Sequence, residues 1–187
     1  TPNTEDLNLE AAGIATDEHH FITVNERLET SAAGVWALGD VNGGPQFTHA
    51  SLDDWRIIAA NLAGGNRSTA DRIIPYTLFI DPELGRIGLT ETEARSRGLP
   101  VRIARLAAHK VPRAMTSGER RGFMKTVVHA HTDKVLGASI LSSAGGEVMS
   151  VIQVAMHAGL PYTALRDMIL AHPTMAEGLN DLFERLE

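Results

Sequence analysis

The stretch GFMKTVVHAHTDKVLGASILS, residues 122–142, decides the fold of the second part of this chain. Two apolar runs, 122–130 and 135–142, flank the turn-forming residues HTDK. Runs of this length around a tight turn are typical of an antiparallel β-hairpin. Further strand patterns stand upstream at 76–80, 86–89 and 101–107. The sequence therefore predicts an antiparallel sheet in this part of the chain.

Helical patterns accompany the sheet. Thr90 and Glu93 form a capping-box pair at the start of a short helix. After the hairpin, the spacing of apolar residues predicts two helices, one ending before Pro161 and one running from Thr163 to near His172. Strands followed by helices that cover one sheet face predict an α+β fold.

The first part of the chain has a different pattern. FITV (21–24) and VWAL (35–38) predict short strands, and helical spacing begins near His49. The stretch GGNRSTADR (64–72) is polar, begins with two glycines and lacks periodicity, as a linker does. We therefore expect a domain boundary near Ala70, which separates domains 1–70 and 71–187.

Composition excludes several classes of protein. Seventeen Lys and Arg against twenty-three Asp and Glu give a net charge of −6, which disfavours binding to nucleic acid. No apolar run approaches the roughly 20 residues of a membrane span. The chain has no cysteine, which excludes disulfides and cysteine-bound zinc and fits a reducing compartment. We expect a cytoplasmic protein.

The segment AHPTMAEGLNDLF (171–183) combines a histidine corner with a helix start. Proline restricts the backbone of His172, and apolar spacing predicts a helix from about Met175 onward. Glu177 could therefore contact the imidazole and hold it in one tautomer, an arrangement suited to general acid–base catalysis. A corner that only caps the helix explains the same spacing equally well. The local sequence leaves both interpretations open.

The segment GVWALGD (34–40) suggests a cofactor site. Gly39 allows close approach to the backbone, and Asp40 offers an acceptor for hydroxyl groups. The helix that follows presents free N–H groups and a positive dipole end near Thr48 and His49. A ribityl flavin has hydroxyls and a ring that gains negative charge, so it suits both features. A simple turn is the alternative for Gly39-Asp40.

Three motifs in order resemble those of the flavoprotein disulfide reductases with two dinucleotide folds, a family that includes dihydrolipoamide dehydrogenase and mercuric reductase. They are GVWALGDVNGGPQFTHASLDDWRIIAANL, FIDPELGRIGLTETEA and AHPTMAEGLNDLF. FTHASLDDWRII and RGFMK are most similar to the reactive-chlorine-resistance or mercuric-reductase-like branch. The resemblance implies an antiparallel dimerisation domain preceded by part of an FAD-binding α/β domain, with FAD and NAD(P)H as cofactors. It also implies a homodimer.

The resemblance assigns roles to individual residues. Asp40 would hold the ribityl chain, the backbone N–H of Thr48 would face the flavin pyrimidine, and Gly39 would give clearance. His172 matches the acid–base residue that serves the partner subunit's flavin, Glu177 matches its orienting partner, and the His172–Pro173 bond would be cis. The cofactor-binding set expected on this basis is Gly39, Asp40, Phe47, Thr48 and His49.

Two departures from the family pattern limit the activity. Mercuric reductases carry a C-terminal cysteine pair and a tyrosine where His172 stands, so mercuric ion reduction is disfavoured. The sequence also lacks a GxGxxG stretch and a CxxxxC pair. We therefore expect a C-terminal portion of a larger enzyme, inactive by itself and with the nicotinamide site outside it.

Other interpretations compete with this one. A non-catalytic dimerisation or scaffold module would share the fold, but it would not need His172 and Glu177 together. A metal-binding module would rest on His129-x-His131, which has no third ligand nearby; a solvated turn explains the pair better, and we expect no metal site. The basic stretch 109–122 is expected to be a solvated loop.

Overall fold

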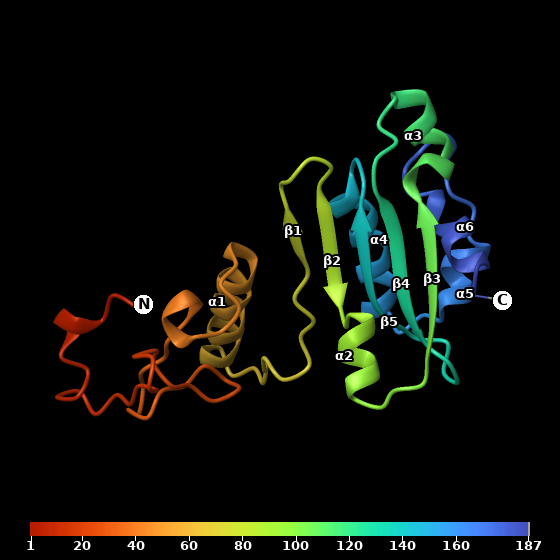
Figure 1. Ribbon diagram of the computed structural model, residues 1–187. Coiled ribbons are helices and arrows are strands. Elements are labelled where there is room, and N and C mark those ends of the chain that lie inside the picture. The colour runs from red at the N-terminus through yellow and green to blue at the C-terminus, as the bar shows by residue number, and fades with distance from the viewer. Residues whose placement is uncertain (187) are drawn as a thin grey trace. The chain divides into compact units, whose positions relative to one another are not determined.

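The computed structural model describes residues 1–186 (Figure 1). The chain divides into two compact units, unit 1 (Thr1–Ile74) and unit 2 (Pro75–Glu187). The boundary between residues 74 and 75 lies just after the polar stretch 64–72 that we expected to be a linker. Each unit has its own apolar cluster.

Unit 2 is built on one five-stranded sheet in the order β1-β2-β5-β4-β3, with every pair antiparallel. The strands are β1 (Tyr76–Leu78), β2 (Leu84–Gly88), β3 (Val101–Ala107), β4 (Phe123–His129) and β5 (Val135–Leu141). The predicted hairpin is therefore confirmed as β4 and β5. At its turn the Nδ1 atom of His129 accepts the backbone N–H groups of His131 and Thr132, at 3.3 and 3.2 Å. The His129-x-His131 pair thus closes a turn.

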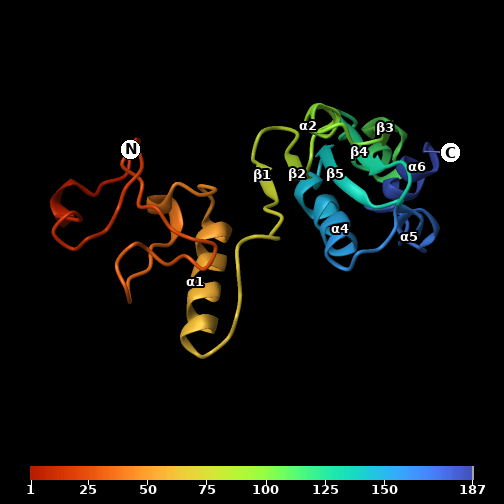
Figure 2. The same ribbon diagram turned by 90° about the horizontal axis from the view of Figure 1, so that it is seen from below.

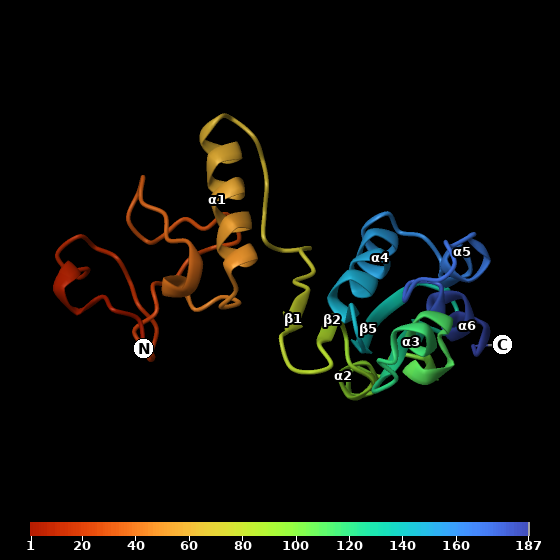
Figure 3. The ribbon, with the colours of Figure 1, turned by 90° about the horizontal axis from the view of Figure 1, so that it is seen from above.

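Three helices cover one face of this sheet (Figures 2 and 3). They are α4 (Gly145–His157), α5 (Tyr162–Asp167) and α6 (Gly178–Glu184). Their apolar residues join those of the strands in one continuous core, in which Ile152, Leu182 and Phe183 are fully buried. The α+β prediction is therefore confirmed. Each helix buries its apolar side against the same face of the sheet, which gives a unit of two layers.

Two shorter helices lie at the ends of strands. Helix α2 (Glu91–Ser96) has the predicted capping box, in which Thr90 accepts from Glu93 N and Glu93 accepts from Thr90 N. The prediction of a solvated loop over 109–122 is wrong, because this stretch contains α3 (Pro112–Ser117) after a 3₁₀ turn, η3 (Ala108–Lys110). Val111 and Ala114 are buried in the main core, whereas Arg113 between them is exposed.

The helix predicted from Thr163 to near His172 ends earlier, at Asp167. The side chain of Asn180 explains this end. Its Nδ2 group donates to the carbonyls of Leu165, Arg166 and Met168, at 2.9 to 3.0 Å. Carbonyls at a helix end need partners of this kind. A residue far along the sequence therefore determines where α5 stops.

Unit 1 contains little regular structure. Its elements are the 3₁₀ turns η1 (Glu5–Leu7) and η2 (Gly39–Asn42) and the helix α1 (Thr48–Leu62). The predicted strands 21–24 and 35–38 are wrong, because each makes only a single isolated bridge, Thr16 with Ile22 and Glu29 with Trp36. A strand requires a neighbour over several residues, and neither segment has one in unit 1.

In the described part of the chain, none of the helices combines the length and apolar character needed to cross a bilayer.

Candidate functional site

The His172 corner holds an imidazole against a carboxylate. The His172–Pro173 bond is cis, as the family resemblance implies. The Nδ1 atom of His172 lies 2.9 Å from Oε2 of Glu177, while the His172 side chain keeps 68 % of its surface exposed. The Glu177 side chain is 16 % exposed, so the carboxylate is the fixed member of the pair. Because Nδ1 faces the carboxylate, Nε2 is the nitrogen left for proton transfer.

The same glutamate also closes a turn. Its Oε1 atom accepts the backbone N–H of Thr174 at 3.0 Å, and its own N–H donates to Oγ1 of Thr174 at 3.2 Å. The Thr174 hydroxyl donates to the carbonyl of Ala171 at 2.7 Å. This reciprocal arrangement has the geometry of a capping box. One carboxylate oxygen of Glu177 therefore contacts the imidazole, and the other closes the turn.

In unit 1, the Gly39-Asp40 pair begins the turn η2. Gly39 has φ +72°, and a Cβ atom there would lie 3.0 Å from Oγ of Ser51. The position therefore requires glycine for its backbone angle and for its space. Asp40, the next residue, is exposed, so its carboxylate is available to a ligand. The strand expected at 35–38 before Asp40 is absent, and Leu38 is exposed.

Asp54 on α1 holds this turn in place. It is only 2 % exposed, and its Oδ2 atom accepts the N–H of Gly39 at 2.9 Å and Nδ2 of Asn42 at 3.2 Å. Its Oδ1 atom lies 2.6 Å from Nη1 of Arg72. Sequence analysis missed this residue. The available signal was an aspartate on the apolar side of a predicted helix, since ionised residues are almost never buried without partners.

The N-terminus of α1 completes the arrangement in unit 1. Thr48 and His49 are exposed on its first turn, and the rings of Phe47 and His49 stack with centroids 5.3 Å apart. The first N–H groups of any helix have no intrahelical acceptor and lie at its positive end. Because Asp54 of α1 binds Gly39, the exposed carboxylate of Asp40 and this helix N-terminus belong to one fixed framework.

Residues 74–183 match the family described as pyridine nucleotide-disulphide oxidoreductase, dimerisation domain. Residues 1–54 match the family described as pyridine nucleotide-disulphide oxidoreductase. The chain belongs to the pyridine nucleotide-disulphide oxidoreductase family. The match over 1–54 lies within unit 1, and the match over 74–183 begins at the last residue of unit 1 and continues into unit 2.

Individual relatives agree with this assignment. The chain is 46% identical to the probable pyridine nucleotide-disulfide oxidoreductase RclA of Escherichia coli K12, over 97% of this chain and 42% of RclA. It is 39% identical to a mercuric reductase of Staphylococcus aureus, over 95% of this chain and 33% of that enzyme. The solved structure of the HOCl-induced flavoprotein disulfide reductase RclA from E. coli superposes with a TM-score of 0.95 at 44% identity, covering 100% of this chain and 43% of that one. The chain therefore spans about two fifths of the length of RclA.

The two groups of candidate site residues lie in different units of the chain. Gly39, Asp40 and the start of α1 lie together in unit 1, whereas His172 and Glu177 lie together in unit 2. The residues in unit 1 fit one part of a flavin, since they provide a glycine with close backbone packing, an exposed acceptor and a helix N-terminus. In the described residues, no group of three His, Cys, Asp or Glu side chains could hold a metal ion.

Proposed function

We propose that this chain supplies the dimer interface, part of the FAD site and an acid–base pair to a flavin- and NAD(P)H-dependent oxidoreductase of the disulfide reductase type. Residues 1–70 would belong to its FAD-binding domain and residues 71–187 to its dimerisation domain. The observation that carries the proposal is the 2.9 Å contact between Nδ1 of His172 and Oε2 of Glu177, on an imidazole that is otherwise exposed.

The flavin-binding side of the proposal rests on unit 1. Asp40 would accept from ribityl hydroxyls, and the N–H of Thr48 would donate to the flavin pyrimidine. Gly39 gives clearance, with Phe47 and His49 bordering the helix start. The helix dipole would stabilise negative charge on the ring, which is electrostatic catalysis of the oxyanion-hole kind. Bound FAD would pass electrons from the nicotinamide towards the substrate.

The acid–base side of the proposal rests on unit 2. His172 would take a proton at Nε2 from an attacking thiol or similar group and later return it. Glu177 would hold the Nδ1–H and stabilise the imidazolium that forms. Its second oxygen is bound to Thr174 N, which fixes the carboxylate during the transfer. These contacts support the assignment of His172 as the general base.

We further propose that the enzyme is a two-fold homodimer with shared active sites, in the cytoplasm. Unit 2 has exposed apolar residues for such an interface, among them Phe79, Val154 and Ile169. Symmetric pairing would bring the His172 of one protomer to the flavin of the other.

Heterodimers test the shared site. Asp40→Ala would inactivate the flavin side of a protomer, and His172→Gln would inactivate the acid–base side. Mixed dimers of the two variants of the full-length enzyme have one site with both groups intact, so they should regain part of the activity. Each variant alone should keep only a small fraction of the activity. If mixing restores nothing although heterodimers form, the shared-site proposal is wrong.

A further inference from the structure

A row of charged and hydroxyl side chains crosses the sheet of unit 2. The strand register pairs Arg86 with Ser139, Ser139 with Lys125, and Lys125 with Arg105, so four neighbouring strands each contribute one residue. The residues next to them along the strands, such as Ile87 and Met124, lie in the helix-covered core. Since side chains alternate along a strand, the row lies on the face opposite the helices.

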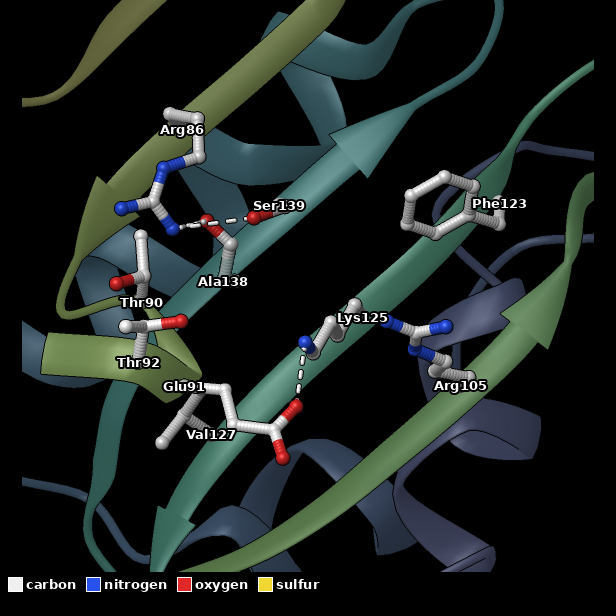
Figure 4. A pocket seen from close by; sticks show the side chains of 10 residues that line it. All are labelled: Arg86, Thr90, Glu91, Thr92, Arg105, Phe123, Lys125, Val127, Ala138 and Ser139. Atoms are coloured by element: carbon white, nitrogen blue, oxygen red, sulfur yellow. Dashed lines mark hydrogen bonds and ion pairs between the residues drawn. The ribbon is translucent and has the colours of Figure 1, made fainter. Parts of the chain in front are cut away.

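These four residues line a pocket of about 210 Å³ (Figure 4). Thr90, Glu91 and Thr92, at the start of α2, close it on one side, and Phe123 and Arg105 lie at the opposite end. We call it the sheet-face pocket. It contains three cationic side chains, one carboxylate and three hydroxyl groups.

The one carboxylate is already committed. Oε2 of Glu91 lies 2.7 Å from Nζ of Lys125, and its Oε1 lies 3.0 Å from Nε of Arg95, outside the pocket. The hydrogen bond from Lys125 and then that from Arg95 lower the pKa of Glu91, so this carboxylate is charged at neutral pH. Within residues 1–186, neither Arg86 nor Arg105 has an ion pair.

Arg86 is the most constrained of the cations. It is only 8 % exposed, and its Nη1 atom donates to the carbonyl of Ala138 and to Oγ of Ser139, at 3.3 and 3.0 Å. Its Nη2 atom donates to the carbonyl of Gly88 at 3.0 Å. All three acceptors are neutral. The guanidinium is therefore fixed in direction without a direct ion pair, and the Glu93 carboxylate acts on its charge only through a coulombic interaction.

A second unfavourable interaction is the repulsion between Arg105 and Lys125. They are directly opposite one another on neighbouring strands, and like charges in this position destabilise a sheet. Arg105 lies over the ring of Phe123, with 5.7 Å from its Cζ atom to the ring centroid. This stacking uses the face of the guanidinium and leaves its N–H groups available in the plane. A bound anion would relieve both the repulsion and the unpaired charge of Arg86.

We propose that the sheet-face pocket binds a phosphate-type oxyanion, either inorganic phosphate or the phosphate group of a monoester. Arg86 and Arg105 supply two positive charges, which match a dianion better than they match chloride or a single carboxylate. The hydroxyls of Ser139, Thr90 and Thr92 supply neutral donors. Glu91 opposes binding, because its carboxylate occupies Lys125 and repels an anion.

A titration of the ¹⁵N-labelled 187-residue chain tests the proposal at constant ionic strength. Sodium phosphate should cause saturable NMR shifts at the amides of Thr90, Arg105 and Ser139 in the millimolar range, and sodium chloride should not. A parallel titration with glycerol phosphate distinguishes the two sources, since tighter binding than that of inorganic phosphate would identify a monoester as the ligand. Absence of saturable shifts with either compound, or equal shifts with chloride, would overturn the proposal.

Two substitutions of opposite sign make the test specific. Arg105→Met removes an exposed pocket cation and should weaken phosphate binding by about threefold or more, since one charge-assisted contact is lost. Glu91→Gln should tighten binding by a similar factor, because it removes the opposing carboxylate and releases Lys125. The matched control is Arg97→Met, which removes an exposed arginine outside the pocket and should change nothing at constant ionic strength. If Arg97→Met weakens binding as much as Arg105→Met does, the response is to net charge alone and the site is contradicted.

Discussion

Unit 1 and unit 2 are stabilised in different ways. Unit 2 has a continuous apolar core that joins its strands to three helices, whereas the buried apolar cluster of unit 1 is limited to Leu28, Ile57 and Ile58. Much of unit 1 is arranged by polar side chains. Asp17 accepts two backbone N–H groups and Asn25 accepts two more. Because exposed hydrogen bonds contribute little net free energy, unit 2 should be much the more stable of the two.

Hydrogen exchange on the 187-residue chain tests this difference most directly and should show the largest effect. Amides of β4 and β5 should exchange at least about 10³-fold more slowly than those of residues 14–37, since core strands open only on global unfolding. FAD should not be needed for protection of unit 2. Equal, strong protection in both units would show that unit 1 is stable by itself and would remove the contrast.

The next largest effect is expected from the proposed acid–base residue of unit 2. In the full-length enzyme, His172→Gln should lower turnover by about 10²–10⁴-fold, the usual contribution of a positioned acid–base group. Because we propose that His172 transfers protons and does not bind the flavin, the flavin spectrum and the dimer should be unchanged.

His157→Gln is the matched control for this variant. His157 is an exposed histidine of the same unit, at the end of α4, so its substitution should leave turnover as it was. If both variants lose activity equally, the effect arises from unit 2 as a whole and His172 has no special role.

Substitution of Asp54 should have a smaller effect, confined to the FAD affinity that unit 1 provides. Asp54→Asn removes the charge that faces Arg72 and weakens the hold on Gly39, so FAD affinity in the full-length enzyme should fall by about tenfold, as for loss of a charged hydrogen bond. Turnover with saturating FAD should change little, because the acid–base pair is intact. The measurement is a fluorescence titration of the apoenzyme with FAD.

Asp53→Asn is the control for that experiment. Asp53 is the neighbour of Asp54 and also binds Arg72, at 3.3 Å, but the hydrogen bond to Gly39 belongs to Asp54. The FAD affinity of the Asp53→Asn variant should stay close to that of the unsubstituted protein. Equal losses in both variants would mean that the ion pair with Arg72, and not the bond to Gly39, controls the flavin site.

The smallest effect is expected at the capping box of α2. Thr90→Ala should destabilise unit 2 by about 0.5–2 kcal/mol, as loss of an N-cap does, in a urea denaturation experiment. Thr92→Ala, two residues along, should change stability less because Thr92 is not part of the capping box.

The capping box of α2 also predicts how the stability of unit 2 changes with pH. The backbone hydrogen bond from Thr90 lowers the pKa of Glu93, so the folded protein binds this proton less readily than the unfolded chain. The contribution is therefore present above the unfolded pKa and is lost as the pH falls through the lower folded value. The difference in stability between Glu93→Gln and the unsubstituted protein should shrink in acid, because the ionised Glu93 carboxylate that the variant lacks is then also lost from the unsubstituted protein. A difference that grows in acid would contradict the capping geometry.

Local sequence patterns predicted unit 2 well and unit 1 poorly. The span of β3, the hairpin and the capping box of α2 are confirmed, because each depends on residues that are close in sequence. The strands 21–24 and 35–38 are wrong, because a strand depends on a partner that no local pattern reveals. The end of α5 was misplaced for the same reason, since the amide of Asn180 caps it from another helix.

For the functional residues, the sequence by itself determined which residue types stand together: His172 with Glu177, and Gly39 with Asp40. Their spacing is short, so local backbone geometry is enough to suggest a contact. Their roles in catalysis and FAD binding remain predictions. Only the tertiary structure showed that one carboxylate oxygen of Glu177 holds the histidine while the other closes the turn.

The tertiary structure alone also decided the residues that act across long sequence separations. Asp54 binds the Gly39 turn across a helix and a loop, and strand register places Arg86, Ser139, Lys125 and Arg105 in one row. Periodicity reports which face of an element is buried, but it does not report which residues of other elements lie opposite. Pairing and packing between distant segments settle that question.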